Sequence, residues 1–278
     1  MTFRPLIALM AFVFVASAAH AQEETEAILA INEGVTYQDA GTPSERYKPL
    51  LEMLSKELKR PIRIKTVTRY SEFDKDLAAG RYELVFIHPA HVGLQAIQRG
   101  NYHGIATAKG FTGYRARVMV PKDSSLTRVE DLQGKKIGVP SIESITTAMF
   151  TAHLKEHKFA EPEKAFQATR YQDAVPFMIE NGFVQAGVTG SGAVAKAWAD
   201  KGGRILAETP AVPIKQFLVS DKIDTATRKR IQTMLLTLSD TPTGKVALEK
   251  VGVPGFVPWD DKLMNEAAQR LNSIRLGL

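Results

Sequence analysis

The chain has 278 residues, no cysteine and a formal net charge of +6. The absence of cysteine excludes disulfide bonds, thiolate metal sites and cysteine nucleophiles. Basic and acidic residues alternate on the presumed helix faces, so the charge predicts solvated surfaces and at most a mild field that gathers anions.

The first residues decide the expected compartment. Residues 1–21 combine a charged start at Arg4, an apolar run over 6–19 and the sequence Ala19-His20-Ala21 before Gln22, which predicts a cleavable signal peptide. The apolar run is shorter than the ~20 residues that span a bilayer, which disfavours a retained anchor. We expect an exported, periplasmic chain that begins near Gln22 and has no nucleic-acid partner.

From residue 27 onward, short β-branched runs alternate with amphipathic stretches, which is typical of repeated βαβ units and a parallel sheet. The apolar side chains of the first amphipathic stretch form one stripe, and Pro61 ends that helix. In the first part of the chain we predict strands at 27–31, 62–67, 84–87, 104–108 and 114–120, and helices at 44–59, 70–79 and 89–98.

The same alternation starts again after a polar turn at residues 121–125. Here we predict strands at 137–139, 166–169, 185–189 and 204–207, and helices at 144–157, 173–180 and 193–200. A strand at 214–219 and three further helical stretches then return to the first unit. The chain crosses between the units near 110–120 and 208–214, and two crossings are what a hinge requires.

These patterns predict an α/β fold with two lobes, each a mostly parallel sheet flanked by helices. Residues 22–115 plus 212–278 form a discontinuous lobe 1, and residues 116–211 form lobe 2. A mature chain of this size is long enough for two cores.

Several motifs follow in a characteristic order. They are Gly34-Val35-Thr36, residues 46–50, residues 77–86, Tyr114, residues 118–124 and residues 131–139. With them, the mature chain resembles the type 2 periplasmic binding proteins, in the branch that binds phosphate, phosphite and phosphonate for ABC importers. The resemblance implies a ligand held in the cleft between the lobes, at the carboxyl ends of strands.

The helix start at residues 144–147 is the strongest local candidate for anion binding. Ser144, Thr146 and Thr147 stand where the family has an anion loop rich in Ser and Thr, so the resemblance assigns them a binding role. Hydroxyls and backbone N–H groups at a positive helix end suit an anion. The alternative is an ordinary N-cap.

A second strand-to-helix turn carries Thr189 and Ser191, flanked by Gly190 and Gly192. Glycine allows the backbone to approach a ligand, and Ser191 either binds or caps. Relatives often carry acidic residues near here that hold a ligand amino group. Their absence makes a ligand ammonium less expected.

Two histidines, His88 and His91, open the helix near residue 89. Imidazole donates to an oxyanion, ligates a metal or binds a proton near neutral pH. We predict contact between one of them and the ligand, with capping or core packing as the alternative. The spacing supplies no third or fourth ligand, so we predict no metal. If either binds as imidazolium, affinity falls as the pH rises past ~6.5.

Three further residues complete the predicted site. Gln172 stands where the resemblance places a histidine of phosphonate binders, and Arg170 beside it can act instead as a bidentate anchor or remain a surface charge. Tyr37 lies on the first cleft loop, where it closes over the ligand or packs in the core.

These features predict a monomeric solute-binding protein that captures a small oxyanion and presents it to an ABC permease. A partner of a sensor histidine kinase and a histidine-based metal carrier are the alternatives. The sequence has no G-x-S-x-G, H-E-x-x-H or phosphate-loop signature, so we expect neither catalysis nor a cofactor.

Overall fold

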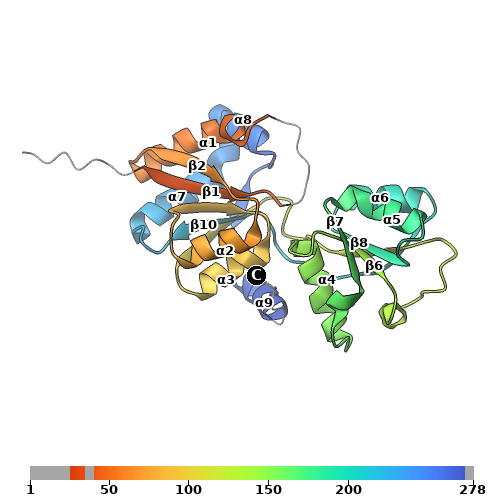
Figure 1. The fold of residues 1–278 in the computed structure, drawn as a ribbon. Coiled ribbons are helices and arrows are strands. Elements are labelled where there is room, and N and C mark those ends of the chain that lie inside the picture. The colour runs from red at the N-terminus through yellow and green to blue at the C-terminus, as the bar shows by residue number, and fades with distance from the viewer. Residues whose placement is uncertain (1–25, 35–40, 273–278) are drawn as a thin grey trace, which may run out of the picture.

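The computed structural model describes residues 26–34 and 41–272. The predicted signal peptide and Tyr37 lie outside these residues. Figure 1 shows two bodies, one built on the sheet that contains β1 and one on the sheet that contains β6, each with helices on its faces. The predicted two-lobed α/β fold is confirmed.

The elements alternate as the sequence patterns predict. The strands are β1 (Ala27–Asn32), β2 (Ile62–Thr66), β3 (Leu84–Ile87), β4 (Tyr102–Ala108), β5 (Arg117–Val120), β6 (Ile137–Pro140), β7 (Phe166–Thr169), β8 (Ala186–Thr189), β9 (Arg204–Glu208), β10 (Gln216–Ser220) and β11 (Phe256–Pro258). The helices are α1 (Pro43–Leu58), α2 (Tyr70–Ala78), α3 (Ala90–Gln98), α4 (Ile145–Glu156), α5 (Val175–Glu180), α6 (Gly192–Asp200), α7 (Thr225–Thr237), α8 (Pro242–Val251) and α9 (Asp261–Leu271).

Lobe 1 is built on a sheet of order β11-β4-β10-β3-β1-β2, and lobe 2 on a sheet of order β7-β6-β8-β5-β9. The strands β1, β2 and β3 run parallel, as do β6, β7 and β8. The strands that follow the two crossings, β10 and β5, run antiparallel to both of their neighbours. A strand that enters from the other lobe starts at the junction, whereas the parallel strands end there.

Polar side chains fix several helix starts. Thr42 and Glu45 form a capping box at α1, and Ser144, Ser191 and Asp260 accept backbone N–H bonds at α4, α6 and α9. Such caps satisfy the N–H groups that a first turn leaves without partners.

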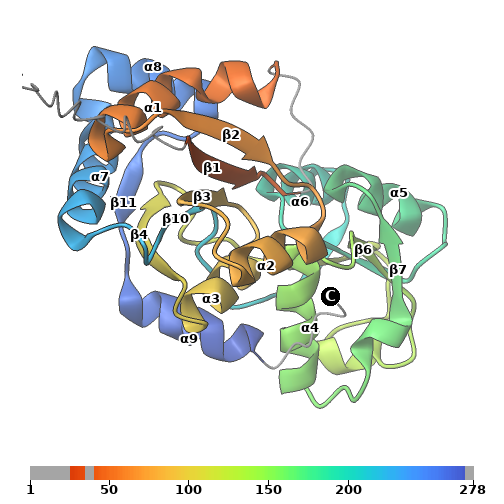
Figure 2. The ribbon, with the colours of Figure 1, turned by 60° about the vertical axis from the view of Figure 1, so that its left-hand side comes forward.

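Lobe 1 buries apolar side chains on both faces of its sheet. One core cluster joins the bodies: it contains Val139 and Phe150 of lobe 2, Leu94 of α3, and Met264 of α9. Helix α9 contacts both α3 and α4, and Figure 2 shows it beside α3. The last described helix therefore packs against both lobes.

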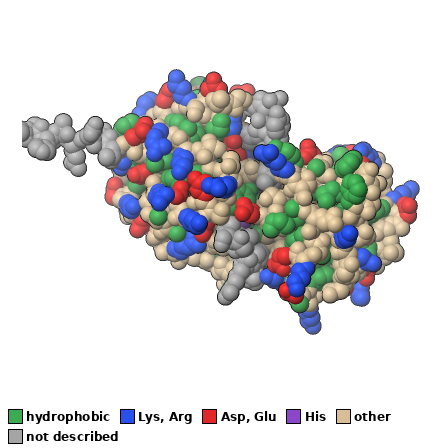
Figure 3. All heavy atoms as spheres, viewed as in Figure 1, with side chains coloured by type: hydrophobic (Ala, Val, Ile, Leu, Met, Phe, Trp, Pro, Cys, Tyr) green, Lys and Arg blue, Asp and Glu red, His purple; other side chains and the backbone are tan. Residues whose placement is uncertain are grey.

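The surface in Figure 3 carries basic and acidic side chains interspersed over both bodies. None of the helices in the described part of the chain combines the length and apolar character that a membrane span needs.

A few element boundaries differ from those predicted. The strand predicted from residue 114 begins at Arg117, because Tyr114 forms only an isolated bridge with Val212. The strand predicted from residue 214 begins at Gln216, because Lys215 adopts a left-handed φ of 56°. The short β11 was not predicted.

Candidate functional site

The turns that follow β3, β6 and β8 lie at the junction of the lobes. The turn after β6 leads to Ser144 and the start of α4, and the turn after β8 leads to Ser191 and the start of α6. The turn after β3 carries His88 and leads into α3. This arrangement brings most of the predicted site residues to one region.

The hydroxyls of Ser144 and Thr147 stabilise the turn before α4. Ser144 Oγ accepts a hydrogen bond from the Thr147 backbone N–H at 3.2 Å, which is the N-cap geometry. Thr147 Oγ1 lies 2.9 Å from the carbonyl oxygen of Pro140 and 2.8 Å from that of Ser141. Both hydroxyls therefore have partners within their own turn, and both residues are buried.

Thr146 faces away from this turn, towards Tyr114 in the first crossing. Its Oγ1 lies 2.6 Å from the hydroxyl oxygen of Tyr114, and either atom can be the donor. The Gln172 side-chain amide also donates to the Tyr114 hydroxyl, at 3.2 Å. The two hydroxyls have two protons but share one hydrogen bond, so one O–H of the pair has no acceptor among the described residues.

Gln172 also accepts hydrogen bonds from the turn before α6. Its Oε1 receives the backbone N–H groups of Gly190 and Ser191 and the hydroxyl of Thr189, at 2.5 to 3.0 Å. These three donors fix the orientation of the amide, which is why Nε2 points to Tyr114. Gln172 thus links the starts of α4 and α6 through Tyr114.

Gly190 is required by the close approach of Tyr114. A Cβ added at residue 190 would overlap the Tyr114 hydroxyl and lie 2.8 Å from Thr146 Oγ1. Any larger residue would displace the two hydroxyls.

On the side of lobe 1, the ring of His88 packs edge-on against Tyr114, with centroids 5.8 Å apart. Gly34, with a φ of +80°, makes room for this ring, since a Cβ there would lie 2.7 Å from His88 Cδ2. Burial lowers the pKa of His88 to about 3, and the charge of Lys215 adds to the shift.

His91 is also buried, and its ring lies edge-on to Tyr70 at 6.1 Å. Burial lowers its pKa to about 4, although the Glu143 backbone of lobe 2 opposes the shift. Neither ring nitrogen has a partner at hydrogen-bond geometry among the described residues. Both histidines are therefore neutral at pH 7 in this arrangement, which disfavours an imidazolium that loses its proton near pH 6.5.

Arg170 is not part of this network. It is exposed, and its guanidinium carbon lies 5.3 Å from the ring centroid of the adjacent Tyr171. Among the described residues, no group of three or more His, Asp or Glu side chains is arranged to hold a metal ion.

Sequence reasoning missed Lys215. This residue lines a small cavity at the ends of β1 and β3, together with Asn32, Glu33, Tyr47, Phe86, His88 and Val251. The sequence shows a single lysine in a crossing segment, and no spacing signal distinguishes it from a solvated one.

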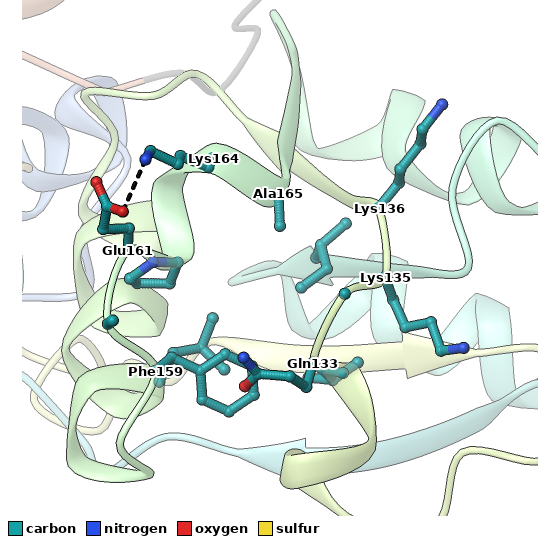
Figure 4. A pocket seen from close by; sticks show the side chains of 13 residues that line it. Gln133, Lys135, Lys136, Phe159, Glu161, Lys164 and Ala165 are labelled. Carbon is teal, nitrogen blue, oxygen red and sulfur yellow. Dashed lines mark hydrogen bonds and ion pairs between the residues drawn. The ribbon is translucent and has the colours of Figure 1, made fainter.

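Two larger cavities lie elsewhere. One of about 450 Å³ in lobe 2 is lined by Gln133, Lys135, Phe159 and neighbouring residues, as Figure 4 shows. Another of about 610 Å³ lies between α1 and α7 in lobe 1. Neither is lined by a predicted site residue, so we place the candidate site at the junction.

The two sheets, the two crossings and the polar turns at the junction define a two-lobed solute-binding protein. A family model described as "ABC transporter, phosphonate, periplasmic substrate-binding protein" matches residues 34–264. The chain therefore belongs to this family of periplasmic binding proteins of ABC transporters, which confirms the family predicted from the sequence motifs.

Solved structures share the fold. XAC2383 from Xanthomonas citri bound to ATP matches with a TM-score of 0.74 and 17% identity, covering 90% of this chain and 98% of that chain. PhnD1 from Prochlorococcus marinus in complex with methylphosphonate matches with a TM-score of 0.66 and 16% identity, over 89% and 98% of the two chains. At these identities the likeness shows the fold alone. No curated protein matches the chain.

Proposed function

We propose that this periplasmic binding protein captures a small oxyanion of the phosphonate or phosphate class and delivers it to an ABC permease. The observation that carries the proposal is the O–H of the Tyr114–Thr146 pair that has no acceptor among the described residues. An oxyanion is the complementary partner, because it accepts such a hydrogen bond and a charged acceptor makes the bond stronger.

Gln172 and the turns before α4 and α6 hold this donor in place. The amide of Gln172 fixes Tyr114, and the hydroxyls of Ser144 and Thr147 fix the helix that carries Thr146. Thr189 and Ser191 act through Gln172. Preorganised donors lower the cost of ordering the site when the ligand binds.

His88 and His91 close the site from lobe 1. As neutral imidazoles they retain one N–H donor each, which suits an oxyanion without adding charge. The cavity beside His88 measures about 10 Å³, which holds about one water molecule. A phosphonate therefore enters when the lobes move apart at the crossings near residues 110–120 and 208–214.

The domain boundaries and the export route belong to the same proposal. Lobe 1 comprises 22–115 plus 212–278 and lobe 2 comprises 116–211, a division that the membership of the two sheets supports. Residues 1–21 direct export and are removed, and the mature chain acts as a monomer without catalysing a reaction.

The test is calorimetric titration of the mature chain with methylphosphonate, inorganic phosphate and sulfate. We expect one of the phosphorus oxyanions to bind. The double variant Tyr114→Phe/Thr146→Val removes both hydroxyl protons and should weaken that binding about tenfold, through loss of one hydrogen bond to a charged group. The matched control is Tyr102→Phe/Thr151→Val, because Thr151 is buried on the same helix as Thr146 and the Tyr102 hydroxyl bonds the backbone of Tyr82 within lobe 1. Equal affinities of wild type and Tyr114→Phe/Thr146→Val would refute the assignment.

A further inference from the structure

Lys215 is a half-buried cation beside an aromatic ring. Its ammonium nitrogen lies 4.1 Å from the centroid of the Phe111 ring. Among the described residues, no carboxylate forms an ion pair with it. A half-buried ammonium loses part of its hydration, and an aromatic face compensates for only a fraction of that loss.

The acidic residue that lines the same cavity is already engaged. Glu33 pairs with the Arg46 guanidinium and accepts a hydrogen bond from the Tyr47 hydroxyl at 3.1 Å. Since Arg46 neutralises Glu33, the charge of Lys215 remains in excess at this point. Burial also lowers the pKa of Lys215, as expected for an ammonium that water solvates poorly.

The position of Lys215 directs this charge to the junction. The residue follows the second crossing and directly precedes β10, and it lines the same cavity as His88. His88 in turn packs against Tyr114 of the first crossing, whose hydroxyl bonds Thr146 and Gln172 of lobe 2. The excess charge therefore lies on lobe 1, across from the donors of lobe 2.

The backbone gives a second, independent indication. Lys215 has a φ of 56°, a left-handed conformation that glycine and asparagine adopt more easily than lysine. Residues held in such conformations concentrate at functional sites. A lysine in this place is unfavourable for the backbone and for its own hydration, unless a bound anion compensates for both.

We propose that Lys215 supplies the counter-charge for the anionic group of the ligand. This role rests on the proposed function and narrows the class of ligand. The ligand carries a formal negative charge that faces lobe 1, so neutral solutes are excluded. This role also gives each lobe its own part in recognition, since lobe 2 contributes neutral hydrogen-bond donors and lobe 1 contributes the cation. The ligand is then bound fully only when both lobes contact it.

The test compares Lys215→Met with Lys109→Met by calorimetric titration with methylphosphonate and inorganic phosphate. Methionine keeps the apolar stem over Phe111 and removes the charge. Lys109 is exposed at the first crossing, so its replacement changes the net charge equally. We expect Lys215→Met to raise the Kd at least about tenfold, as for loss of an ionic hydrogen bond, and Lys109→Met to leave it within about twofold.

Lys215→Asn provides a second variant, because asparagine tolerates the left-handed backbone and keeps the protein folded if methionine does not. Wild-type affinity in Lys215→Met or Lys215→Asn would overturn the role of Lys215 and leave the proposed function intact. A wild-type protein that binds neither anion would overturn the proposed function and this role with it.

Discussion

Replacing Tyr114 with phenylalanine removes one oxygen atom that serves two buried side chains. The hydroxyl lies 2.6 Å from Thr146 Oγ1 and 3.2 Å from Gln172 Nε2, and both residues are nearly inaccessible to solvent. A buried donor without a partner costs about 1 to 3 kcal/mol. Thr146 can reorient its hydroxyl, whereas the Gln172 amide is fixed by three donors, so we expect the free energy of unfolding to fall by about 2 kcal/mol.

The same substitution should leave the Kd for methylphosphonate within about threefold of wild type, since Thr146 keeps a proton that it can donate to the ligand. Adding Thr146→Val removes both protons and should weaken binding about tenfold. Urea unfolding measures the effect on stability and calorimetric titration the effect on binding. Tyr102→Phe is the control: the Tyr102 hydroxyl bonds the backbone of Tyr82 within lobe 1, so its loss should lower stability without changing affinity. Unchanged stability in Tyr114→Phe, or unchanged affinity in the double variant, would refute the network as we describe it.

Three further predictions concern the same region. Gly190→Ala should destabilise the protein by about 1 to 3 kcal/mol, measured by urea unfolding, because the added methyl group overpacks against Tyr114. It should also raise the Kd for methylphosphonate, measured by calorimetry. Wild-type values of both would contradict the close approach of Tyr114 to residue 190. Thr147→Val keeps the side-chain shape but removes the hydrogen bonds to the turn carbonyls, so it should lower the free energy of unfolding by about 1 kcal/mol, again by urea unfolding. His88 and His91 have pKa values of about 3 and 4 in the folded protein and near 6.5 in the unfolded chain. The free energy of unfolding should therefore fall as the pH drops from about 6.5 towards 4, by at most about 1.4 kcal/mol per pH unit for each histidine. A His91→Gln variant with the same pH dependence as wild type would refute this.

The alternation of short apolar runs and amphipathic stretches was enough to predict nearly every strand and helix. Such patterns reflect local burial, which one sequence records directly. The errors lie at the crossings, where the strands begin at Arg117 and Gln216 rather than earlier. A strand continues only where a neighbour supplies hydrogen bonds, and the position of that neighbour depends on how the lobes are arranged.

The candidate site could be predicted where it follows a strand and opens a helix, as at the N-caps Ser144 and Ser191. The resemblance drew attention to Gln172, although its hydrogen bond to Tyr114 depends on the rotamers of both side chains. The role that we propose for Lys215 could not be predicted, because it is argued from a left-handed backbone and from the pairing of Glu33 with Arg46. Neither is encoded by local spacing.

Helix α9 bears on how tightly any ligand is held, although it contributes no residue to the proposed site. Its contacts with α3 and α4 bury apolar side chains such as Met264 and Leu271 against both bodies. Separating the bodies exposes part of this surface at about 25 cal/mol per Å², which favours the compact arrangement. Apparent affinity scales with the fraction of molecules already in the arrangement that is competent to bind. Substitutions in the contacts of α9 with α3 and α4 would therefore change how tightly the ligand is held, without altering which ligand is recognised.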